Sequence, residues 1–415
     1  MKAELISAGT ELLLGEIVDT NAVYLSQKLA ENGVDVYYRH TVGDNLGRLV
    51  EVLRLAFSRA DAVIVTGGLG PTQDDITREA IAKATSCPLV RSPEAVTKLR
   101  AFFARRGRIP TENNLCQAEA PQGASLIDNE YGTAPGIRHE YPGGVVFALP
   151  GPPAELHPMF ERDVLPYLLE QAGARAQRLY TRALLLADIG ESNTAEILRE
   201  LISAQTDPTI ALYASPARVR VRLATKDTDE NAARRRLDEV EVQVRELLGE
   251  HVFGADDDTM EVVLARLLRE RAATLAVTES CTGGMIASRI TDVAGASDYF
   301  LGGIVAYSND VKQALLGVSS ELLEAHGAVS EPCAAAMAEG VRSALGAHYS
   351  LATTGIAGPA GGTDDKPVGL VYIAVADQRG TMVAEHNWPG TREQFKQRVS
   401  QMALNMLRKR ILDII

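Results

Sequence analysis

Residues 62–75, AVIVTGGLGPTQDD, contain a short apolar run that stops at a glycine-rich turn. The run predicts a buried strand, and the proline and threonine after the glycines predict that a helix follows. Two similar strands are expected upstream, at 2–8 and 34–38, and a helix is expected after each, the second over 46–58. Strands that alternate with helices are typical of a parallel sheet covered on both faces, in which ligands bind beyond the carboxyl ends of the strands.

The rest of the chain continues this pattern with one interruption. A strand at 145–149 is followed by a segment with a β-α-β-β-α pattern, including a helix over 192–204, which predicts a small α+β domain. The α/β alternation then returns, and it closes with a hairpin within 369–387 and a long helix over 392–412. We therefore expect domains at 1–172, 173–252 and 256–415.

Composition and charge exclude several classes of protein. The 415 residues are 46% hydrophobic and 23% charged, and their net charge is −12, which makes the chain a poor candidate for general nucleic-acid binding. No apolar stretch is long enough for a signal peptide or a membrane span, so we expect a cytoplasmic protein with no membrane partner. The four cysteines lie too far apart for a zinc finger, and a disulfide framework is not expected.

The strongest local signal for chemistry is ESCTGG at 279–284, where a predicted strand turns through small residues into a helix. Such a turn exposes a side chain and directs backbone N–H groups at an oxyanion. Ser280 is the candidate nucleophile, and Lys312 and Tyr307 follow the next predicted strand as candidates to activate it. The alternatives are that Ser280 only caps the helix and that Lys312 is a solvent-exposed lysine. Cys281 is a rival nucleophile, but we favour a small buried hydrophobic role for it.

A second glycine-rich segment, residues 353–362, also follows a predicted strand and could bring backbone close to a ligand. The alternative is a plain connecting loop. Lys366 and Arg392 are candidate partners for an anion, although each alone is better explained as a surface charge.

The glycine-rich turn of the first domain predicts an acidic pocket. Glycine backbone can hold a phosphate, and the carboxylates of Asp74 and Asp75 can hold a divalent cation. Thr72 and Asp75 have the spacing of a capping box, so we rank Asp74 above Asp75 as a ligand contact. Further polar residues should approach the same edge of the sheet: Glu11, Asp19, Asn21 and Glu155.

Longer motifs identify a family. GTELLLGEIVDTN (9–21) and TGGLGPTQDDITREA (66–80) resemble the molybdopterin-binding-like domain of the CinA (competence/damage-inducible protein A) family. ESCTGG (279–284), GGIVAYSNDVKQALLGV (302–318) and TGIAGPAGGTDDKPVGLVYIA (354–374) resemble the C-terminal domain of that family, which also occurs alone as the PncC-type nicotinamide mononucleotide amidohydrolase. The resemblance implies an α/β protein with an N-terminal three-layer molybdopterin-binding-like domain, a small KH-like middle domain and a C-terminal α/β amidohydrolase domain.

For the C-terminal domain, the resemblance implies hydrolysis of nicotinamide mononucleotide to nicotinate mononucleotide and ammonia, without a cofactor. Ser280 would be the nucleophile, Lys312 the base and Tyr307 the hydrogen-bonding partner of Lys312. The oxyanion would bind to backbone N–H groups of Cys281, Thr282, Gly283 and Gly284, and the nucleotide's ribose and phosphate to Thr354, Gly355, Gly358 and Arg392.

For the N-terminal domain, the resemblance implies hydrolysis of ADP-ribose to AMP and ribose 5-phosphate with a divalent metal (Mg, Mn or Co), and K⁺ as an optional further cation. The implied substrate contacts are Thr10, Glu11, Asn21, Gly67, Gly68, Gly70 and Thr72. The implied metal ligands are Asp74, Asp75, Asp19 and Glu155. Fold alone does not transfer activity, so a domain that binds a pterin or nucleotide without hydrolysing it stays an alternative.

The middle domain and the partners are less defined by the resemblance. Where an RNA-binding KH module would carry GxxG, this chain has Gly190-Glu191-Ser192-Asn193, which argues against RNA binding and favours a spacer or dimerisation role. We expect a homodimer that takes small nucleotides and no nucleic acid. A competence or recombination accessory protein, acting through protein contacts, is the remaining alternative.

Overall fold

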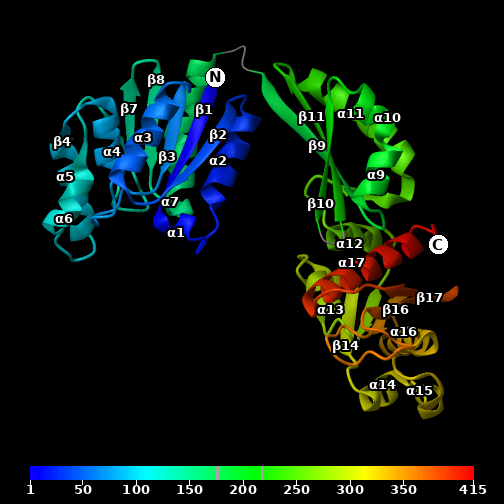
Figure 1. Cartoon of the computed structure of the whole chain (residues 1–415). Helices are drawn as coiled ribbons and strands as arrows, with labels where there is room; N and C mark the ends of the chain where they lie inside the picture. The colour runs from blue at the N-terminus through cyan, green and yellow to red at the C-terminus, as the bar shows by residue number, and fades with distance from the viewer. Residues whose placement is uncertain (174–176, 216–217) are drawn as a thin grey trace. The chain divides into compact units, whose positions relative to one another are not determined.

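Three parallel strands form the centre of the first sheet, and nearly all their side chains are buried. They are β1 (Lys2–Ala8), β3 (Ala62–Thr66) and β8 (Gly144–Leu149) in a computed structural model that describes residues 1–173, 177–215 and 218–415 (Figure 1). Burial on both faces explains why these segments are continuous apolar runs. The sheet lies in the first of two compact units, which consists of Met1–Tyr180 and Lys226–Ala233, and the second consists of Thr181–Thr225 and Arg234–Ile415.

The sequence predicted a parallel sheet, but this sheet is mixed. Its order is β2-β1-β3-β8-β7-β6, and β2 (Asp35–Val42) is parallel to β1. β7 (Gly136–Tyr141) runs antiparallel to β8, and β6 (Ser125–Ile127) runs antiparallel to β7 and so in the direction of β8. The reason is the two-residue turn between Tyr141 and Gly144, because a parallel neighbour needs a crossover of a dozen residues or more. A separate two-stranded sheet pairs β4 (Leu89–Arg91) with β5 (Glu119–Pro121).

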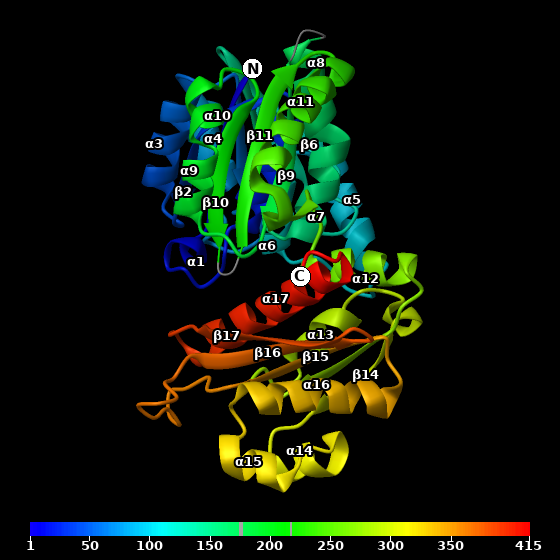
Figure 2. The ribbon, with the colours of Figure 1, turned by 90° about the vertical axis from the view of Figure 1, so that its right-hand side faces the viewer.

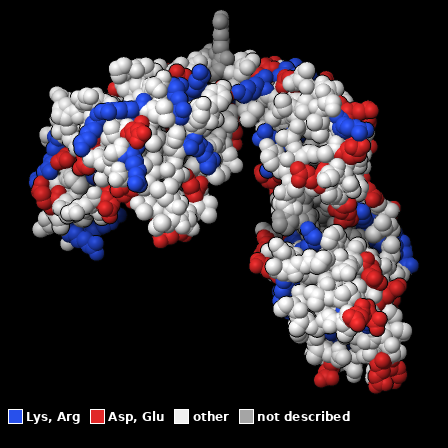
Figure 3. Space-filling model, in the orientation of Figure 1, with Lys and Arg blue, Asp and Glu red and all other residues white. Residues whose placement is uncertain are grey.

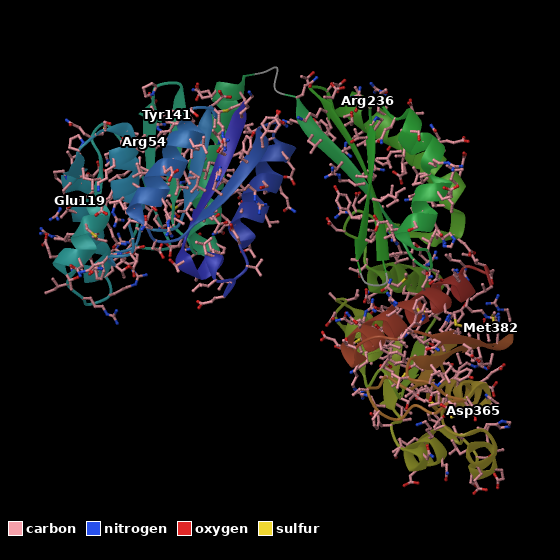
Figure 4. The ribbon with its side chains drawn as sticks, in the orientation of Figure 1. Arg54, Glu119, Tyr141, Arg236, Asp365 and Met382 are labelled. Atoms are coloured by element: carbon pink, nitrogen blue, oxygen red, sulfur yellow. The ribbon has the colours of Figure 1, made fainter. Side chains whose placement is uncertain are left out.

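Helices cover both faces of the first sheet and make it a three-layer structure. One face packs against α3 and α4 through Leu53 and Ile81, and the other packs against α2, α7 and α8 through Leu25 and Leu168. Tyr141 adds a polar anchor, because its hydroxyl donates to the Ala60 carbonyl at 2.6 Å (Figure 4). The helices of this unit are α1 (Thr10–Leu13), α2 (Thr20–Glu31), α3 (Leu46–Phe57), α4 (Thr77–Thr85), α5 (Pro93–Ala104), α6 (Glu112–Leu115), η1 (Cys116–Ala118), α7 (Pro153–Met159), η2 (Phe160–Val164) and α8 (Leu165–Ala172).

The helix expected directly after Pro71-Thr72 begins later than predicted, at Thr77. A turn separates the glycines from α4, and Asp74 and Asp75 lie in it. The carboxylate of Asp75 accepts hydrogen bonds from the Thr72 N–H (2.8 Å) and hydroxyl (2.6 Å). The capping-box prediction therefore identified a real contact between these two residues, but the contact closes a turn instead of starting a helix.

The middle segment forms a four-stranded sheet with helices along one side (Figure 1). Its strands, in sheet order, are β10 (Thr209–Ser215), β11 (Arg218–Asp227), β9 (Arg178–Leu186) and β12 (Val252–Ala255). Its helices are α9 (Glu191–Ile197), α10 (Arg199–Ala204), α11 (Glu230–Leu248) and η3 (Gly249–His251). The single helix expected over 192–204 is interrupted at Leu198, which is fully buried. The Gly190–Asn193 segment, which replaces a GxxG loop, forms the beginning of α9.

The C-terminal sheet has the order β14-β13-β15-β16-β17. Its strands are β13 (Leu275–Glu279), β14 (Phe300–Val305), β15 (Tyr349–Gly355), β16 (Leu370–Asp377) and β17 (Gly380–Asn387). β13, β14 and β15 are parallel, whereas β16 and β17 form the expected antiparallel hairpin. The helices are α12 (Met260–Glu270), α13 (Met285–Thr291), η4 (Ala296–Asp298), α14 (Asn309–Leu316), α15 (Ser320–His326), α16 (Glu331–Leu345) and α17 (Arg392–Ile411).

Both faces of this second sheet are also covered. α12, α13 and α17 pack on one face, and α16 packs on the other with α14 and α15 beyond it (Figure 2). The middle segment joins the same core through Leu185 and Phe253. Two polar contacts from α17 reinforce this: Arg408 donates to the Glu250 carbonyl and Asn405 to Asp188. Residues 181–415 therefore pack together, apart from Lys226–Ala233.

The surface charges are mixed in sign. On the face shown in Figure 3, Lys and Arg side chains are interspersed with Asp and Glu. Among the described residues, no helix combines the length and the apolar character that crossing a bilayer requires.

Candidate functional sites

Ser280 lies in the turn that leaves the carboxyl end of β13. Its backbone N–H donates to the Thr353 carbonyl of the neighbouring parallel strand β15 at 2.9 Å. The preceding residue, Glu279, is almost fully buried, and its carboxylate accepts the N–H groups of Gly284, Ile286 and Ala287 at 2.8–3.1 Å. A carboxylate at the N-terminus of α13 is stabilised by the unpaired N–H groups and the helix dipole. The turn that presents Ser280 is therefore held from both sides.

Lys312 meets Ser280 from α14. Its side chain is 1% exposed, and its Nζ lies 3.3 Å from Ser280 Oγ. The same nitrogen donates to the backbone carbonyls of Ala306 (2.8 Å) and Tyr307 (3.3 Å). As an ammonium, Lys312 donates to all three oxygens. As a neutral amine, with two N–H bonds and one lone pair, it would donate to the two carbonyls and accept the Ser280 hydroxyl proton on the lone pair. Lys312 is thus a buried lysine beside a hydroxyl, not a solvent-exposed one.

Burial sets the protonation of the groups around Ser280. Loss of hydration lowers the pKa of Lys312, because the charged ammonium is the form that burial disfavours. The same effect raises the pKa of the neighbouring Cys281 thiol to about 12. Cys281 is 5% exposed and stays a neutral thiol near pH 7, which makes it a poor nucleophile. The electrostatics therefore favour Ser280 as the reactive group.

Tyr307 contacts Lys312 through its backbone carbonyl and not through its phenol. The phenol is exposed, and its oxygen lies 3.1 Å from Arg392 Nη2, a donor at the first turn of α17. Arg392 Nη1 donates to the Gly358 carbonyl at 3.1 Å. Arg392 therefore joins Tyr307, whose backbone carbonyl contacts Lys312, to the glycine-rich segment after β15.

Two of the other expected ligand contacts are engaged inside the protein. The Thr354 hydroxyl donates to the Ala328 carbonyl at 2.7 Å, and Lys366 Nζ donates to the carbonyls of His326 and Val329 at 2.7 Å. Both side chains hold the segment before α16 in place. Gly355 is close to β16, where an added Cβ would lie 2.6 Å from the Leu370 carbonyl oxygen.

The N–H groups expected to bind an oxyanion are not equally available. The Gly284 N–H already donates to Glu279. The backbone N–H groups of Cys281 and Thr282 are directed at the Cys281 sulfur. Within the described ranges, no acceptor is recorded for the N–H group of Gly283. Gly283 has a φ of +64°, a left-handed conformation that favours glycine. The Thr282 side chain is buried and pairs with Thr353.

Sequence reasoning missed Lys396. Its Nζ would lie 3.6 Å from a Cβ added to Gly283, so this cation lies beside the turn that carries Ser280. Lys396 is four residues after Arg392 on α17, and residues at this spacing share a helix face. That spacing was the only signal for Lys396 in the sequence.

The expected acidic site of the first domain forms a pocket of about 700 Å³ at the carboxyl ends of β1, β3 and β8. Its lining includes most of the residues expected there: Glu11, Asp19, Asn21, Gly67, Gly68, Gly70, Asp74, Asp75 and Glu155. Thr10 and Thr72 are not part of the lining. Thr10 exchanges hydrogen bonds with Asp44, a lining residue that sequence reasoning missed although it follows the neighbouring strand β2.

Close strand ends and an unpaired amide shape this pocket. Gly67 has a φ of +92°, and an added Cβ would lie 2.3 Å from the Ala8 carbonyl oxygen, so only glycine fits. Asn21 donates to the Gly151 carbonyl at 2.7 Å, but its Oδ1 atom is buried and accepts no hydrogen bond from the described residues. Because an unpaired buried acceptor is costly, Asn21 Oδ1 is suited to a donor on a ligand.

The carboxylates fit a divalent cation only in one way. Asp19 caps α2 by accepting the Ala22 N–H and also accepts the Ser7 hydroxyl, and Glu155 accepts from Asn129. In the described part of the chain, no group of three His, Cys, Asp or Glu side chains is close enough to hold a metal. The residues therefore do not fit an all-protein cage. They fit Mg²⁺ that is bound by one or two carboxylates and takes its other ligands from water and phosphate.

Comparisons with known proteins agree with this arrangement of domains. The chain matches the families described as probable molybdopterin binding domain (residues 4–170), damage-inducible protein CinA KH domain (181–254) and CinA C-terminal domain (257–411). These matches define a three-part α/β protein.

Relatives match along the full length. A putative competence-damage inducible protein of Symbiobacterium thermophilum is 50% identical over 425 residues, and the match covers 100% of both chains. One of the same name from Caldicellulosiruptor bescii is 46% identical over 413 residues, and a CinA-like protein of Kosmotoga olearia is 44% identical over 415 residues, again with 100% coverage of both chains. This chain belongs to the CinA family, and the resemblance inferred from its motifs is confirmed.

Proposed function

We propose that this protein recycles pyridine nucleotides and that its C-terminal domain hydrolyses nicotinamide mononucleotide to nicotinate mononucleotide and ammonia. One observation carries the proposal: Lys312 Nζ is buried 3.3 Å from Ser280 Oγ and has backbone carbonyls as its other partners. Burial favours the neutral amine, which is the form that can accept a proton from serine.

The proposed reaction begins with attack of Ser280 Oγ on the carboxamide carbon. The hydroxyl proton passes to Lys312 Nζ, and the new oxyanion would accept a hydrogen bond from the N–H group of Gly283. Lys312 then gives its proton to the departing nitrogen, which leaves as ammonia, and an ester remains on Ser280. Water attacks this ester with Lys312 again as base, and nicotinate mononucleotide is released as the proton returns to Ser280.

Cations near the turn support a nucleotide as substrate. Arg392 contacts the Tyr307 phenol, and Lys396 lies beside Gly283 in the turn that carries Ser280. A mononucleotide carries a phosphate that these two cations would bind. The test is ammonia release from nicotinamide mononucleotide by the purified full chain. If nicotinamide mononucleotide yields no ammonia while the folded protein stays intact, the proposal is wrong.

A second activity is proposed for the pocket of the first domain: hydrolysis of ADP-ribose to AMP and ribose 5-phosphate. The unpaired Oδ1 of Asn21 and the glycine-rich turn beside the carboxylates support a ligand that carries both hydroxyl groups and phosphates. A divalent metal bound there by Asp74 and a neighbouring carboxylate would neutralise the phosphates. Assays of AMP formation test this activity, and binding without turnover would favour a nucleotide- or pterin-binding module instead.

A further inference from the structure

Residues 326–329, between α15 and α16, form a connection in which each of the four backbone carbonyls accepts a hydrogen bond from a side chain. Lys366 Nζ donates to the first and the last of these carbonyls, each at 2.7 Å. The hydroxyl groups of Ser330 and Thr354 donate to the two carbonyls between them, at 2.8 and 2.7 Å. Since residues 327–329 lie outside regular secondary structure, these donors determine the path of the connection.

Lys366 is the main anchor of this connection. It reaches the connection from the glycine-rich segment after β15, 40 positions from His326 in the chain. A Cβ added to Gly327 would lie 3.2 Å from Lys366 Nζ, so the amino group is seated closely against the backbone. A charged donor makes stronger hydrogen bonds than a neutral hydroxyl, and Lys366 supplies two of them.

The connection leads directly into α16, which forms part of the wall around Lys312. Cys333, in the first turn of α16, is fully buried and belongs to the same core as Ala306, whose carbonyl accepts from Lys312 Nζ. Burial raises the pKa of the Cys333 thiol, and the positive charges of Lys312 and Lys366 oppose that rise. The thiol therefore lies near both amino groups.

The groups that face the amine of Lys312 carry no fixed charge. Ser280 and Cys281 face it from the turn after β13, Cys333 faces it from α16, and two backbone carbonyls complete its surroundings. The two thiols are the titratable groups that act on it among the described residues, and burial has the larger effect. The protonation of Lys312 therefore depends on the exclusion of water, which requires α16 to stay in place.

We infer that Lys366 is a positioning residue for Lys312: it fixes the connection before α16, and α16 in turn keeps water away from the amine. This inference rests on the proposed amidase reaction, in which Lys312 is the base. It gives a role to a lysine whose amino group is held by backbone carbonyls and does not touch the reacting atoms.

The pH dependence of ammonia release from nicotinamide mononucleotide tests this role. Lys366→Met keeps the apolar stem but removes the donors, so water should reach Lys312, and the acidic limb of kcat/KM should move up by about one pH unit. Above that limb, kcat/KM should stay within about threefold of the wild type, because the deprotonated base is then present in both proteins. Lys366→Arg keeps charged N–H donors and should return the limb to near the wild-type position. Asp365→Asn, at the exposed neighbouring residue, is the matched control and should leave the profile unchanged (Figure 4).

A stability measurement repeats the test without turnover. The difference in free energy of unfolding between the wild type and Lys312→Met should rise with pH from the folded-state pKa of Lys312 up to the usual lysine value of about 10.4. In the Lys366→Met background this rise should begin about one pH unit higher, because a hydrated Lys312 keeps its proton to higher pH. Urea titrations of the four proteins at several pH values measure both differences.

The outcomes separate the role of Lys366 from the proposed reaction. A loss of kcat/KM by the same factor at every pH, or equal shifts of the limb in Lys366→Met and Lys366→Arg, would overturn the inference. If Lys366→Met does not fold, Lys366→Gln, which can still donate to one carbonyl, takes its place and should move the limb in the same direction. If the wild type releases no ammonia, the amidase proposal fails and the urea titrations decide alone: a rise that begins at the same pH in both backgrounds would reject the positioning role as well.

Discussion

The amino nitrogen of Lys312 lies 3.3 Å from the hydroxyl oxygen of Ser280, although 32 positions separate the two residues in the chain. Parallel pairing of β13 with β14 brings them together, because Glu279 pairs with Val305 at the end of both strands. Ser280 follows β13 directly, and Lys312 follows β14 on the next helix. The register of two strands therefore sets the distance on which the proposed chemistry depends.

Replacement of Ser280 by alanine should abolish ammonia release from nicotinamide mononucleotide. Loss of a nucleophile typically reduces kcat by roughly 10³-fold or more. Cys281→Ala is the matched control and should keep most of the activity, since burial holds that thiol in its neutral form. Wild-type activity in Ser280→Ala, together with loss in Cys281→Ala, would move the nucleophile to Cys281.

Lys312→Arg should be nearly as inactive as Lys312→Ala. Arginine keeps a positive charge but supplies no neutral base near pH 7. Steady-state kinetics of both variants, with circular dichroism to check folding, provide the measurement. If the arginine variant retains most of the wild-type kcat, Lys312 binds the substrate as a charge and does not accept the proton.

The stability of the protein should depend on pH through Lys312. Its folded-state pKa is lowered by burial, so between that pKa and the usual lysine value near 10.4 the unfolded chain binds more protons than the folded one. The free energy of unfolding of the wild type, relative to that of Lys312→Met, should therefore rise with pH across this range. Urea titrations at several pH values measure the difference. A difference that does not change with pH would mean that Lys312 is charged when folded.

Asp377 should matter most for stability in the C-terminal domain. Burial alone would raise the pKa of its carboxyl, but hydrogen bonds from Arg410 and Arg379 outweigh it and hold the pKa at about 2. This stabilisation is present above about pH 4, the unfolded value, and is lost as the pH falls toward 2. Asp377→Asn leaves Arg410 buried without its carboxylate and should lower the free energy of unfolding by roughly 3–5 kcal/mol at pH 7.

Arg379→Ala is the comparison for that variant. Arg379 is about 40% exposed, so its loss should cost less than about 1 kcal/mol. The guanidinium of Arg410 also contacts the sulfur of Met382 on β17 at 3.0 Å. Equal losses of stability in Asp377→Asn and Arg379→Ala would contradict the importance assigned to the buried pair.

Chelation should separate the two proposed activities. EDTA should stop AMP formation from ADP-ribose, since a metal would neutralise the phosphates, and it should spare ammonia release, because serine attack on a carboxamide needs no metal. Asp74→Asn should reproduce the effect of EDTA on AMP formation. Asp75→Asn should instead cost about 1 kcal/mol of stability through its contacts with Thr72. Undiminished AMP formation in excess EDTA would show that the metal proposal is wrong.

Much of the fold could be predicted because apolar runs have the period of the elements they form. The strand at 62–65 and the helix over 46–58 appear as β3 (Ala62–Thr66) and α3 (Leu46–Phe57). The predicted start of α4 was wrong, because the contact between Thr72 and Asp75 has the same sequence spacing in a turn as in a capping box. The local sequence pattern therefore cannot distinguish a turn from a helix N-terminus when both contain the same side-chain contact.

The site was harder to predict than the fold, because its properties depend on packing between distant segments. Lysine is ordinarily exposed, and only the packing of α14 against α16 shows that Lys312 is buried. The sequence also does not reveal which backbone N–H groups are already hydrogen-bonded. ESCTGG contains four candidate donors, and only the structure shows that the Gly284 N–H donates to Glu279. Lys396 lies on a helix more than a hundred residues after the turn it approaches.

Glu279 also has a consequence for Lys312. A carboxylate one residue before the nucleophile could have served as the counter-ion of the lysine, and a salt bridge of that kind would keep the amine protonated. Both oxygens of Glu279 are instead committed to N–H groups of α13, and no carboxylate among the described residues pairs with Lys312. The N–H groups of α13 thus occupy the carboxylate of Glu279, so that this carboxylate is not a counter-ion of Lys312. Lys312 therefore has no carboxylate partner, among the described residues, that would hold its proton.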